Sequence, residues 1–167
     1  MIVTVTLNPS IDLSCRCRHV SPDYKLHCDH VRRDPGGGGL NVCRAIRTLG
    51  GDATAVWLSG GRTGRMLDDL LEDRGVPGRP VRIAGNTREN HYVHEDSSDR
   101  EFRFILPGPE ITEGELAAVE DRLEELEGVE YLVLSGSAPP GAPDDCHARL
   151  AGRAGRMRRP VAASGTL

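Results

Sequence analysis

The sequence predicts an α/β protein in which helices cover a parallel β-sheet. Two observations support this class: short β-branched runs alternate with segments whose apolar residues recur at spacings of three and four, and glycines separate the two kinds of segment. The length of 167 residues allows one domain with a substantial core and is too short for two ordinary domains. We therefore expect residues 1–167 to belong to one α/β domain.

The first half of the chain shows a repeated order of strand, loop and helix. Residues 2–7 form a β-branched run that stops at Asn8-Pro9, which predicts a buried strand ending in a turn. Residues 15–33 alternate polar and apolar positions around a turn at 21–23, which is typical of a two-stranded flap. The other expected elements of this half are a helix that follows the glycines at 36–39, a strand at 53–58 and a helix that ends at Gly75.

The second half begins with a hairpin that interrupts this order. Residues 90–94 and 101–106 flank a polar turn and predict its two strands. Thr112 and Glu115 form a capping box at the start of the next helix, in which the hydroxyl and the carboxylate satisfy free amides. The remaining expected elements are a strand at 131–134, a helix from about 143 to 157 and a short strand at 161–163.

Composition and charge exclude several classes of function. The 21 Lys and Arg residues against 25 Asp and Glu residues give a net charge of −4, which argues against a general nucleic-acid binder. No apolar run approaches the roughly 18 to 20 residues of a membrane span, and the N-terminus shows no secretion signal. The odd number of five cysteines favours reduced thiols. We expect a cytoplasmic protein with no nucleic-acid partner and no membrane partner.

Charged residues near the C-terminus separate into an acidic and a basic group. Residues 110–130 are strongly acidic, and the arginines that follow are Arg149, Arg153, Arg156, Arg158 and Arg159. We interpret the two groups as solvated faces of two helices.

The four glycines at 36–39 are the first candidate for a binding site. Consecutive glycines let the backbone approach a ligand closely, and the helix start behind them offers free amides to an anion or a polyol. No Lys-Ser or Lys-Thr follows them, so they do not form a Walker loop, and they lack the spacing of a dinucleotide fingerprint. Taken alone, the run fits a binding loop or a flexible turn equally well.

Five motifs in order carry a resemblance to a known family. They are Thr6-Leu7-Asn8-Pro9-Ser10-Ile11-Asp12, Pro35-Gly36-Gly37-Gly38-Gly39-Leu40-Asn41-Val42, Thr87-Arg88-Glu89-Asn90, Phe102-Arg103-Phe104-Ile105-Leu106-Pro107-Gly108 and Leu134-Ser135-Gly136-Ser137-Ala138-Pro139-Pro140-Gly141. Over about 150 residues the chain resembles the N-terminal part of the PfkB branch of ribokinase-like sugar kinases. The greatest likeness is to the minor 6-phosphofructokinases, 1-phosphofructokinases and tagatose-6-phosphate kinases.

The resemblance implies a fold, a reaction and a site. The fold would be a ribokinase-like, Rossmann-type α/β sandwich with a small β-sheet lid, formed by segments near 13–34 and 87–106, that also clasps a second subunit of a homodimer. The reaction would move the γ-phosphoryl group of ATP, with Mg²⁺, to a hydroxyl of a phosphorylated ketohexose such as fructose 6-phosphate. The residues that match substrate-binding positions are Asp12, Gly37, Gly38, Asn41, Arg88 and Ser137, and Lys25 matches a lysine near the transferred phosphate.

Each of these side chains also has a purely structural explanation. Asp12 could cap a turn, Arg88 could pair with Glu89 or Glu95, and Ser137 could simply end a strand. The roles that the resemblance implies agree with the chemistry of the side chains, because a carboxylate accepts sugar hydroxyls and a guanidinium binds phosphate through two parallel hydrogen bonds.

The chain also departs from the family pattern. His27 stands where close relatives have Arg, and Ala162-Ala163 where an Asp-containing turn is expected. The turn Gly-Ala-Gly-Asp, which supplies the family's general base, and the nucleotide loops are absent from the 167 residues. We therefore expect a domain truncated before the nucleotide-binding half, doubtful binding of ATP and Mg²⁺, no catalytic residue, and no useful turnover.

Two alternatives remain open at this point. The chain could be a non-catalytic sugar-phosphate-binding or dimerisation module. A less favoured alternative is a zinc-binding module, because Cys15, Cys17 and His19 alternate on one flap strand and Cys28 and His30 on the other. The single residue between the cysteines argues against zinc, since structural sites usually separate paired cysteines by about two to four residues.

Overall fold

In the part of the chain that the structure describes, the main sheet has five parallel strands. The computed structural model describes residues 1–156 and 160–164. In spatial order the strands are β5 (Gly78–Ile83), β4 (Ala53–Gly60), β1 (Ile2–Thr6), β8 (Tyr131–Ser135) and β9 (Val161–Ser164). The expected parallel α/β sheet is therefore confirmed, with β1, the first strand of the chain, at its centre.

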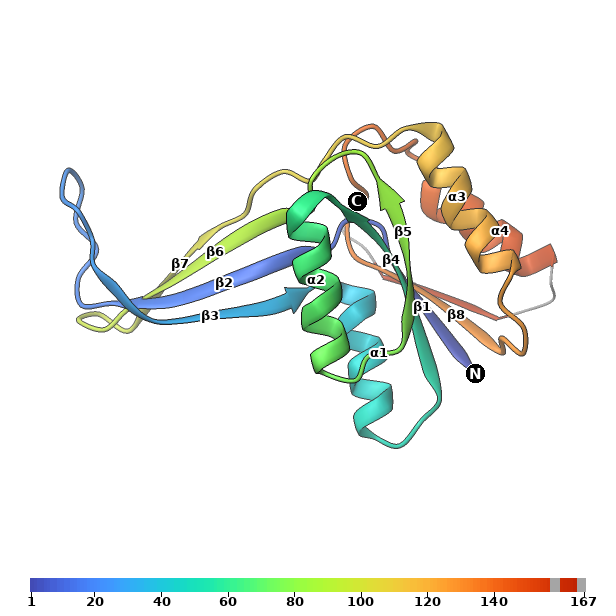
Figure 1. The fold of residues 1–167 in the computed structure, drawn as a ribbon, viewed down its shortest axis with the longest axis horizontal. Coiled ribbons are helices and arrows are strands. Elements are labelled where there is room, and N and C mark those ends of the chain that lie inside the picture. The colour runs from blue at the N-terminus through green and yellow to red at the C-terminus, as the bar shows by residue number, and fades with distance from the viewer. Residues whose placement is uncertain (157–159, 165–167) are drawn as a thin grey trace.

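Helices cover both faces of this sheet (Figure 1). Helices α1 (Gly38–Thr48) and α2 (Gly61–Asp73) lie on one face, and α3 (Glu113–Glu124) and α4 (Cys146–Arg156) lie on the other. Successive side chains of β1 point to opposite faces of the sheet. Val3 and Val5 belong to the core under α3 and α4, and Ile2 packs against the core under α1 and α2. No helix within the described residues is long and apolar enough to span a membrane.

A second sheet of four strands extends away from the helices, at the left of Figure 1. Its order is β3 (Cys28–Gly36), β2 (Ser10–Cys17), β6 (Arg88–Glu95) and β7 (Arg100–Phe104). We call this sheet, with its connecting loops, the lid. The central pair β2 and β6 is parallel, and the two outer pairs are antiparallel. The lid begins at Ser10, three residues before the expected boundary at 13, so that Asp12 belongs to a lid strand.

Sequence reasoning missed strand β5. Gly78 and Pro80 argue against a strand in this segment, since both residues are unfavourable in a central strand. Pro80 is tolerated because β5 is an edge strand that pairs only with β4. Val81 is buried in the core beside residues of α3, so the strand is held by packing as well as by its hydrogen bonds.

The capping box at the start of α3 is confirmed. The Thr112 hydroxyl accepts a hydrogen bond from the Glu115 amide at 3.2 Å, and the Glu115 carboxylate accepts one from the Thr112 amide at 2.7 Å. Helix α4 begins at Cys146, three residues later than the expected position 143, and the expected final residue of that helix, Met157, lies outside the described residues.

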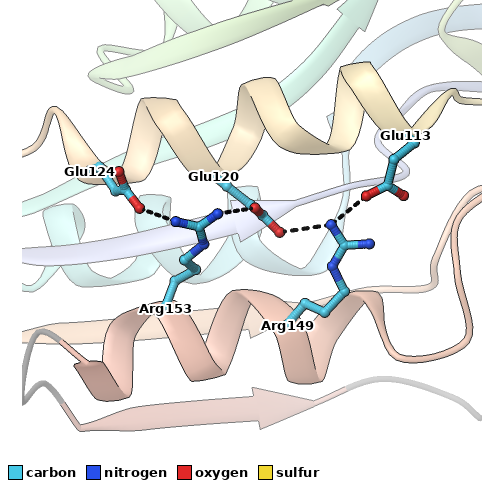
Figure 2. Close-up of polar contacts among 5 residues, drawn as sticks. All are labelled: Glu113, Glu120, Glu124, Arg149 and Arg153. Atoms are coloured by element: carbon cyan, nitrogen blue, oxygen red, sulfur yellow. Dashed lines mark hydrogen bonds and ion pairs between the residues drawn. The ribbon is translucent and has the colours of Figure 1, made fainter.

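The acidic and basic groups do not form two separate solvated faces. Figure 2 shows that Arg149 and Arg153 of α4 reach across to α3 and share the carboxylate of Glu120, whose side chain is only 6% exposed. The same arginines also bind Glu113 and Glu124, respectively. The interpretation as solvated faces was therefore wrong for Glu120, Arg149 and Arg153, which join the two helices, whereas Glu113 and Glu124 remain exposed at the ends of the network. Arg158 and Arg159 lie outside the described residues.

Candidate functional site

The candidate site lies where the lid joins the main sheet. Four segments meet there: the beginning of β2, the beginning of β6, the glycine turn before α1 and the turn after β8. The register of the lid brings Ser10 opposite both Gly36 and Arg88. The backbone of Gly38 packs against Ser135 and Gly136. The fold thus unites segments that are far apart in the chain; the contact between Asn8 and Ser137, for example, joins residues 129 positions apart.

Asp12 is held by two neighbouring polar side chains. It lies opposite Asn90 in the parallel pair of β2 and β6. Asn90 Nδ2 donates to Asp12 Oδ1 at 3.0 Å, and Ser10 Oγ donates to the same oxygen at 2.7 Å. Both partners are almost completely buried, while Asp12 is half-buried. Among the described residues, the second carboxylate oxygen, Oδ2, accepts no hydrogen bond. It can therefore accept hydrogen bonds from ligand hydroxyls.

Gly36 makes room for this carboxylate. A Cβ atom at position 36 would lie 2.5 and 2.6 Å from the two carboxylate oxygens of Asp12. Real side chains do not come this close, so any residue larger than glycine would displace the carboxylate. The first glycine of the run is therefore required for the geometry of Asp12, a reason that the sequence alone did not reveal.

The next glycines form the start of α1. Gly37 is the N-cap residue, has a φ of 138° and provides no capping side chain. The Leu40 amide donates to Thr6 Oγ1 at 3.1 Å, which ties the first helical turn to the end of β1. The amides of Gly38 and Gly39 have no partner within the helix and stand at the positive end of its dipole. This turn is suited to a polyol or an anion.

Arg88 is a guanidinium without a carboxylate partner among the described residues. It donates to the carbonyls of Leu106 and Asn8, both at 3.2 Å, and it makes no ion pair with Glu89 or Glu95. Its Nε is buried and has no hydrogen-bond partner in the described chain. A positive charge held in place and not neutralised is a favourable position for a phosphate group.

Asn8 links Arg88 to Ser137. The backbone carbonyl of Asn8 accepts from Arg88, and its Nδ2 donates to Ser137 Oγ at 3.2 Å. Ser137 follows the end of β8 and is half-buried, so its hydroxyl has a defined position beside the turn. The alternative that Ser137 only ends a strand does not account for this contact.

Asn41 and Lys25 differ from the other candidates in their surroundings. Asn41 lies in the first turn of α1, is exposed, and accepts a hydrogen bond from Arg44 at 3.2 Å. Lys25 is exposed and belongs to the loop between β2 and β3. Figure 1 shows this loop at the far end of the lid from α1. The structure therefore brings Asp12, the glycines, Arg88 and Ser137 together, with Asn41 on the adjoining turn, and it leaves Lys25 apart from them.

Sequence reasoning assigned no role to Ser10, Asn8 or Asn90. All three are buried polar residues, and all three lie inside motifs that carried the family resemblance. Their motifs were a signal of importance, but their function as supports became visible only when β2 and β6 were seen to be adjacent.

Neither a surface hollow near α2 nor a metal centre is a better candidate for the functional site. A hollow of about 460 Å³ near α2 is lined by Trp57 and Asp68, but the Asp68 carboxylate already accepts hydrogen bonds from Trp57, Ser59 and Arg82. In residues 1–156 and 160–164, no three His, Cys, Asp or Glu side chains are grouped so that they could hold a metal ion. The zinc alternative therefore finds no ligand set in this part of the chain.

Comparison with known proteins agrees with the geometry. The model of the pfkB family carbohydrate kinases matches residues 5–162. ATP-dependent 6-phosphofructokinase isozyme 2 of Mycobacterium tuberculosis is 42% identical over 164 residues, which are 96% of this chain and 48% of the relative. The Escherichia coli isozyme 2 is 44% identical over 140 residues, 84% of this chain and 45% of the relative. The chain thus spans about half the length of these relatives.

Solved structures of phosphofructokinases also resemble this chain over nearly its whole length and about half of theirs. Phosphofructokinase-2 from Escherichia coli in complex with fructose-6-phosphate superposes with a TM-score of 0.93 and 38% identity, over 99% of this chain and 55% of that one. A possible 1-phosphofructokinase from Thermotoga maritima gives a TM-score of 0.89 at 27% identity, over 99% of this chain and 54% of that one.

The parallel sheet with its separate small sheet is thus a ribokinase-like fold, the architecture of a class of carbohydrate kinases. Within this class, the chain belongs to the pfkB family and is similar to phosphofructokinase-2, 1-phosphofructokinase and tagatose-phosphate kinase. The matched region is the N-terminal part of these relatives.

Proposed function

We propose that residues 1–167 form the sugar-phosphate site and lid of an ATP-dependent kinase that acts on a ketohexose phosphate such as fructose 6-phosphate. One observation carries the proposal: Asp12 and Arg88 flank the same junction between lid and sheet. Within residues 1–156 and 160–164, one oxygen of the Asp12 carboxylate accepts no hydrogen bond and the Arg88 guanidinium has no carboxylate partner. A sugar phosphate combines the two groups that these side chains bind best, hydroxyls and a phosphate.

Each residue then has a distinct role in binding. Asp12 accepts sugar hydroxyls, and Ser10 and Asn90 keep its carboxylate in one orientation. Gly37, Gly38 and Asn41 offer the start of α1 to the sugar, and Ser137 contributes a hydroxyl from the turn after β8. Arg88 holds the phosphate that the substrate already carries. This division leaves the acceptor hydroxyl free to face the nucleotide.

The nucleotide and its metal ion belong to the proposal only through the family. The relatives from Mycobacterium tuberculosis and Escherichia coli are named as ATP-dependent. The 167 residues contain no Gly-Ala-Gly-Asp turn, and the described residues offer no cluster of ligands for Mg²⁺. We therefore assign no residue of the chain to ATP or Mg²⁺. Since phosphoryl transfer depends on positioning and charge stabilisation, the 167-residue polypeptide alone should not turn over.

The lid supports a second part of the proposal, a homodimer. Several apolar side chains of the lid and its loops are exposed, namely Tyr24, Leu26, Val31, Phe104, Ile105 and Leu106. A second copy of the lid would cover such a surface. In a homodimer, the loop that carries Lys25 would be available to the site of the other subunit, which explains how a residue so far from its own site could act near a phosphate.

A cytoplasmic location completes the proposal, and the five free cysteines agree with a reducing compartment.

Calorimetric titration combined with a coupled kinase assay tests the proposal. The 167-residue chain should bind fructose 6-phosphate at one site per subunit and show no turnover with ATP. Arg79→Met should bind normally, because Arg79 is exposed on β5, an edge strand of the main sheet, and lies outside the lid. Ordinary turnover would contradict the predicted inactivity. Absence of sugar-phosphate binding by a folded chain would contradict the site itself.

A further inference from the structure

Three of the five thiols of the chain are gathered in the lid. Cys15 and Cys17 lie on β2, and Cys28 is the first residue of β3. Cys17 and Cys28 are directly opposite each other in the antiparallel register of these strands. Residues paired in this way have Cα atoms about 4.5 to 5.5 Å apart, within the roughly 4.4 to 6.8 Å that a disulfide spans.

The register distinguishes Cys17 from Cys15 as the partner of Cys28. Ser14 pairs with Arg32 while Arg16 pairs with Asp29, so β3 contains one additional residue opposite Cys15. Cys15 therefore faces a bulge and is not the register partner of Cys28, although its thiol lies near the Cys28 thiol as well. Cys17, two residues further along, has Cys28 as its register partner.

The two thiols also differ in their access to solvent. Cys28 is exposed, whereas Cys17 is only 4% exposed and donates a hydrogen bond to the His19 carbonyl at 3.3 Å. An oxidant from solvent would therefore meet Cys28 first and find the resolving thiol already beside it. Accessibility and a neighbouring resolving thiol are two of the features that favour a reversible response to oxidation.

We propose that Cys17 and Cys28 form a reversible disulfide when the protein meets a peroxide. Hydrogen peroxide oxidises the Cys28 thiol to a sulfenic acid and releases one water. The Cys17 sulfur then attacks the Cys28 sulfur, the S–S bond forms, and the sulfenic oxygen leaves as a second water with the Cys17 proton. Two thiols are oxidised by two electrons, one peroxide is reduced, and a dithiol reductant reverses the change.

The disulfide would change the part of the lid that carries Lys25. It joins the two ends of the loop at residues 18–27, which contains Lys25 and the exposed Tyr24 and Leu26. A loop whose ends are covalently joined samples fewer conformations. Oxidation would therefore restrict the far end of the lid without touching Asp12 or Arg88.

The environment of Cys28 also predicts the pH dependence of the reaction. Desolvation raises the pKa of the Cys28 thiol, and the neighbouring Cys15 raises this pKa further; Cys17 acts in the opposite direction, and Asp29, the adjacent carboxylate, raises the pKa slightly. The thiolate is the reactive form. The rate of oxidation should therefore rise as the pH increases above neutrality, since the thiolate is then more populated.

Tryptic mapping of the oxidised chain tests the proposal. Trypsin releases Cys15 in residues 1–16, Cys17 in residues 17–18 and Cys28 in residues 26–32, so each thiol is in a separate peptide. After treatment with hydrogen peroxide, with cysteines blocked before digestion, we expect a linked species of residues 17–18 and 26–32 that disappears on reduction. Cys28→Ser should abolish this species, and Cys15→Ser should retain it.

Three results would overturn the proposal. Linkage of residues 1–16 to residues 26–32 would assign the disulfide to Cys15. A Cys28 to Cys28 cross-link between two chains would show that the thiol reacts outside its own lid. Oxidation of Cys28 to sulfinic acid with Cys17 still free would show that no resolving thiol is within reach. Because Cys28 is exposed, its serine variant should fold normally, which circular dichroism verifies.

Discussion

Asn90 Nδ2 lies 3.0 Å from Asp12 Oδ1, and the two residues face each other across the parallel strands β2 and β6. This contact connects two segments 78 residues apart and fixes the carboxylate on which the sugar-binding proposal depends. Asn90 also donates to Ser10 Oγ at 3.0 Å, so the three side chains form a closed set of hydrogen bonds. The orientation of Asp12 therefore depends on contacts within β2 and between β2 and β6.

Removal of the Asn90 side chain should weaken binding of the sugar phosphate. Asn90→Ala deletes the hydrogen bond to the Asp12 carboxylate; hydrogen bonds to charged groups contribute about 1.5–3 kcal/mol, so the Kd for fructose 6-phosphate should rise by at most roughly 10- to 150-fold. Glu89→Gln is the matched control, because successive residues of β6 point to opposite faces of the lid. Calorimetry measures both Kd values. An unchanged Kd in Asn90→Ala would show that Asp12 needs no support from β6.

Replacement of Arg88 should affect the phosphate and not the sugar. Arg88→Met keeps the apolar stem and removes at least one hydrogen bond to a charged group, worth about 1.5–3 kcal/mol, so the Kd for fructose 6-phosphate should rise at least roughly 10- to 150-fold. The Kd for unphosphorylated fructose should be nearly the same in both proteins. Equal losses for fructose and fructose 6-phosphate would place Arg88 in the framework of the site and not at the phosphate.

The shared carboxylate of Glu120 should stabilise the packing of α3 against α4. Glu120→Gln weakens two charged hydrogen bonds of a side chain that is 6% exposed, and we expect a loss of about 1–3 kcal/mol in the free energy of unfolding. Glu124→Gln removes only the exposed end of the network and should cost at most about 0.5 kcal/mol. Urea denaturation compares the two variants. Equal midpoints would contradict a special role for Glu120.

The far end of the lid should lose stability in acid. The Ser98 hydroxyl, the Val20 amide and His19 lower the pKa of the Glu95 carboxyl from its usual value of 4.5. A carboxyl whose pKa is lowered by folding contributes stability that is present above its unfolded pKa and lost as the pH falls through its folded pKa. The difference in unfolding free energy between the native chain and Glu95→Gln should therefore be constant near pH 7 and shrink below about pH 4.5. A pH-independent difference would refute this role of the charge.

Some parts of the fold and site could be predicted because their causes are local. The capping box at Thr112 and the glycine turn before α1 depend on neighbours in sequence, and both predictions were confirmed. Other parts depend on which strands become adjacent. The contact of Asn90 with Asp12 requires β6 to lie beside β2, and edge position alone makes Pro80 acceptable in β5. Likewise, the helix pairing around Glu120 turned two apparently solvated charge groups into one network.

A nuclear magnetic resonance titration of the ¹⁵N-labelled chain tests the central claim most directly. On addition of fructose 6-phosphate, we predict shifts at the amides of Gly38 and Gly39 and at the Arg88 Nε–H, which is buried and has no hydrogen-bond partner among the described residues. Fructose without phosphate should move the amide signals and leave Arg88 unchanged. Shifts confined to other regions, such as the hollow beside Trp57, or no shifts at all in the folded chain, would contradict the assignment of the sugar-phosphate site.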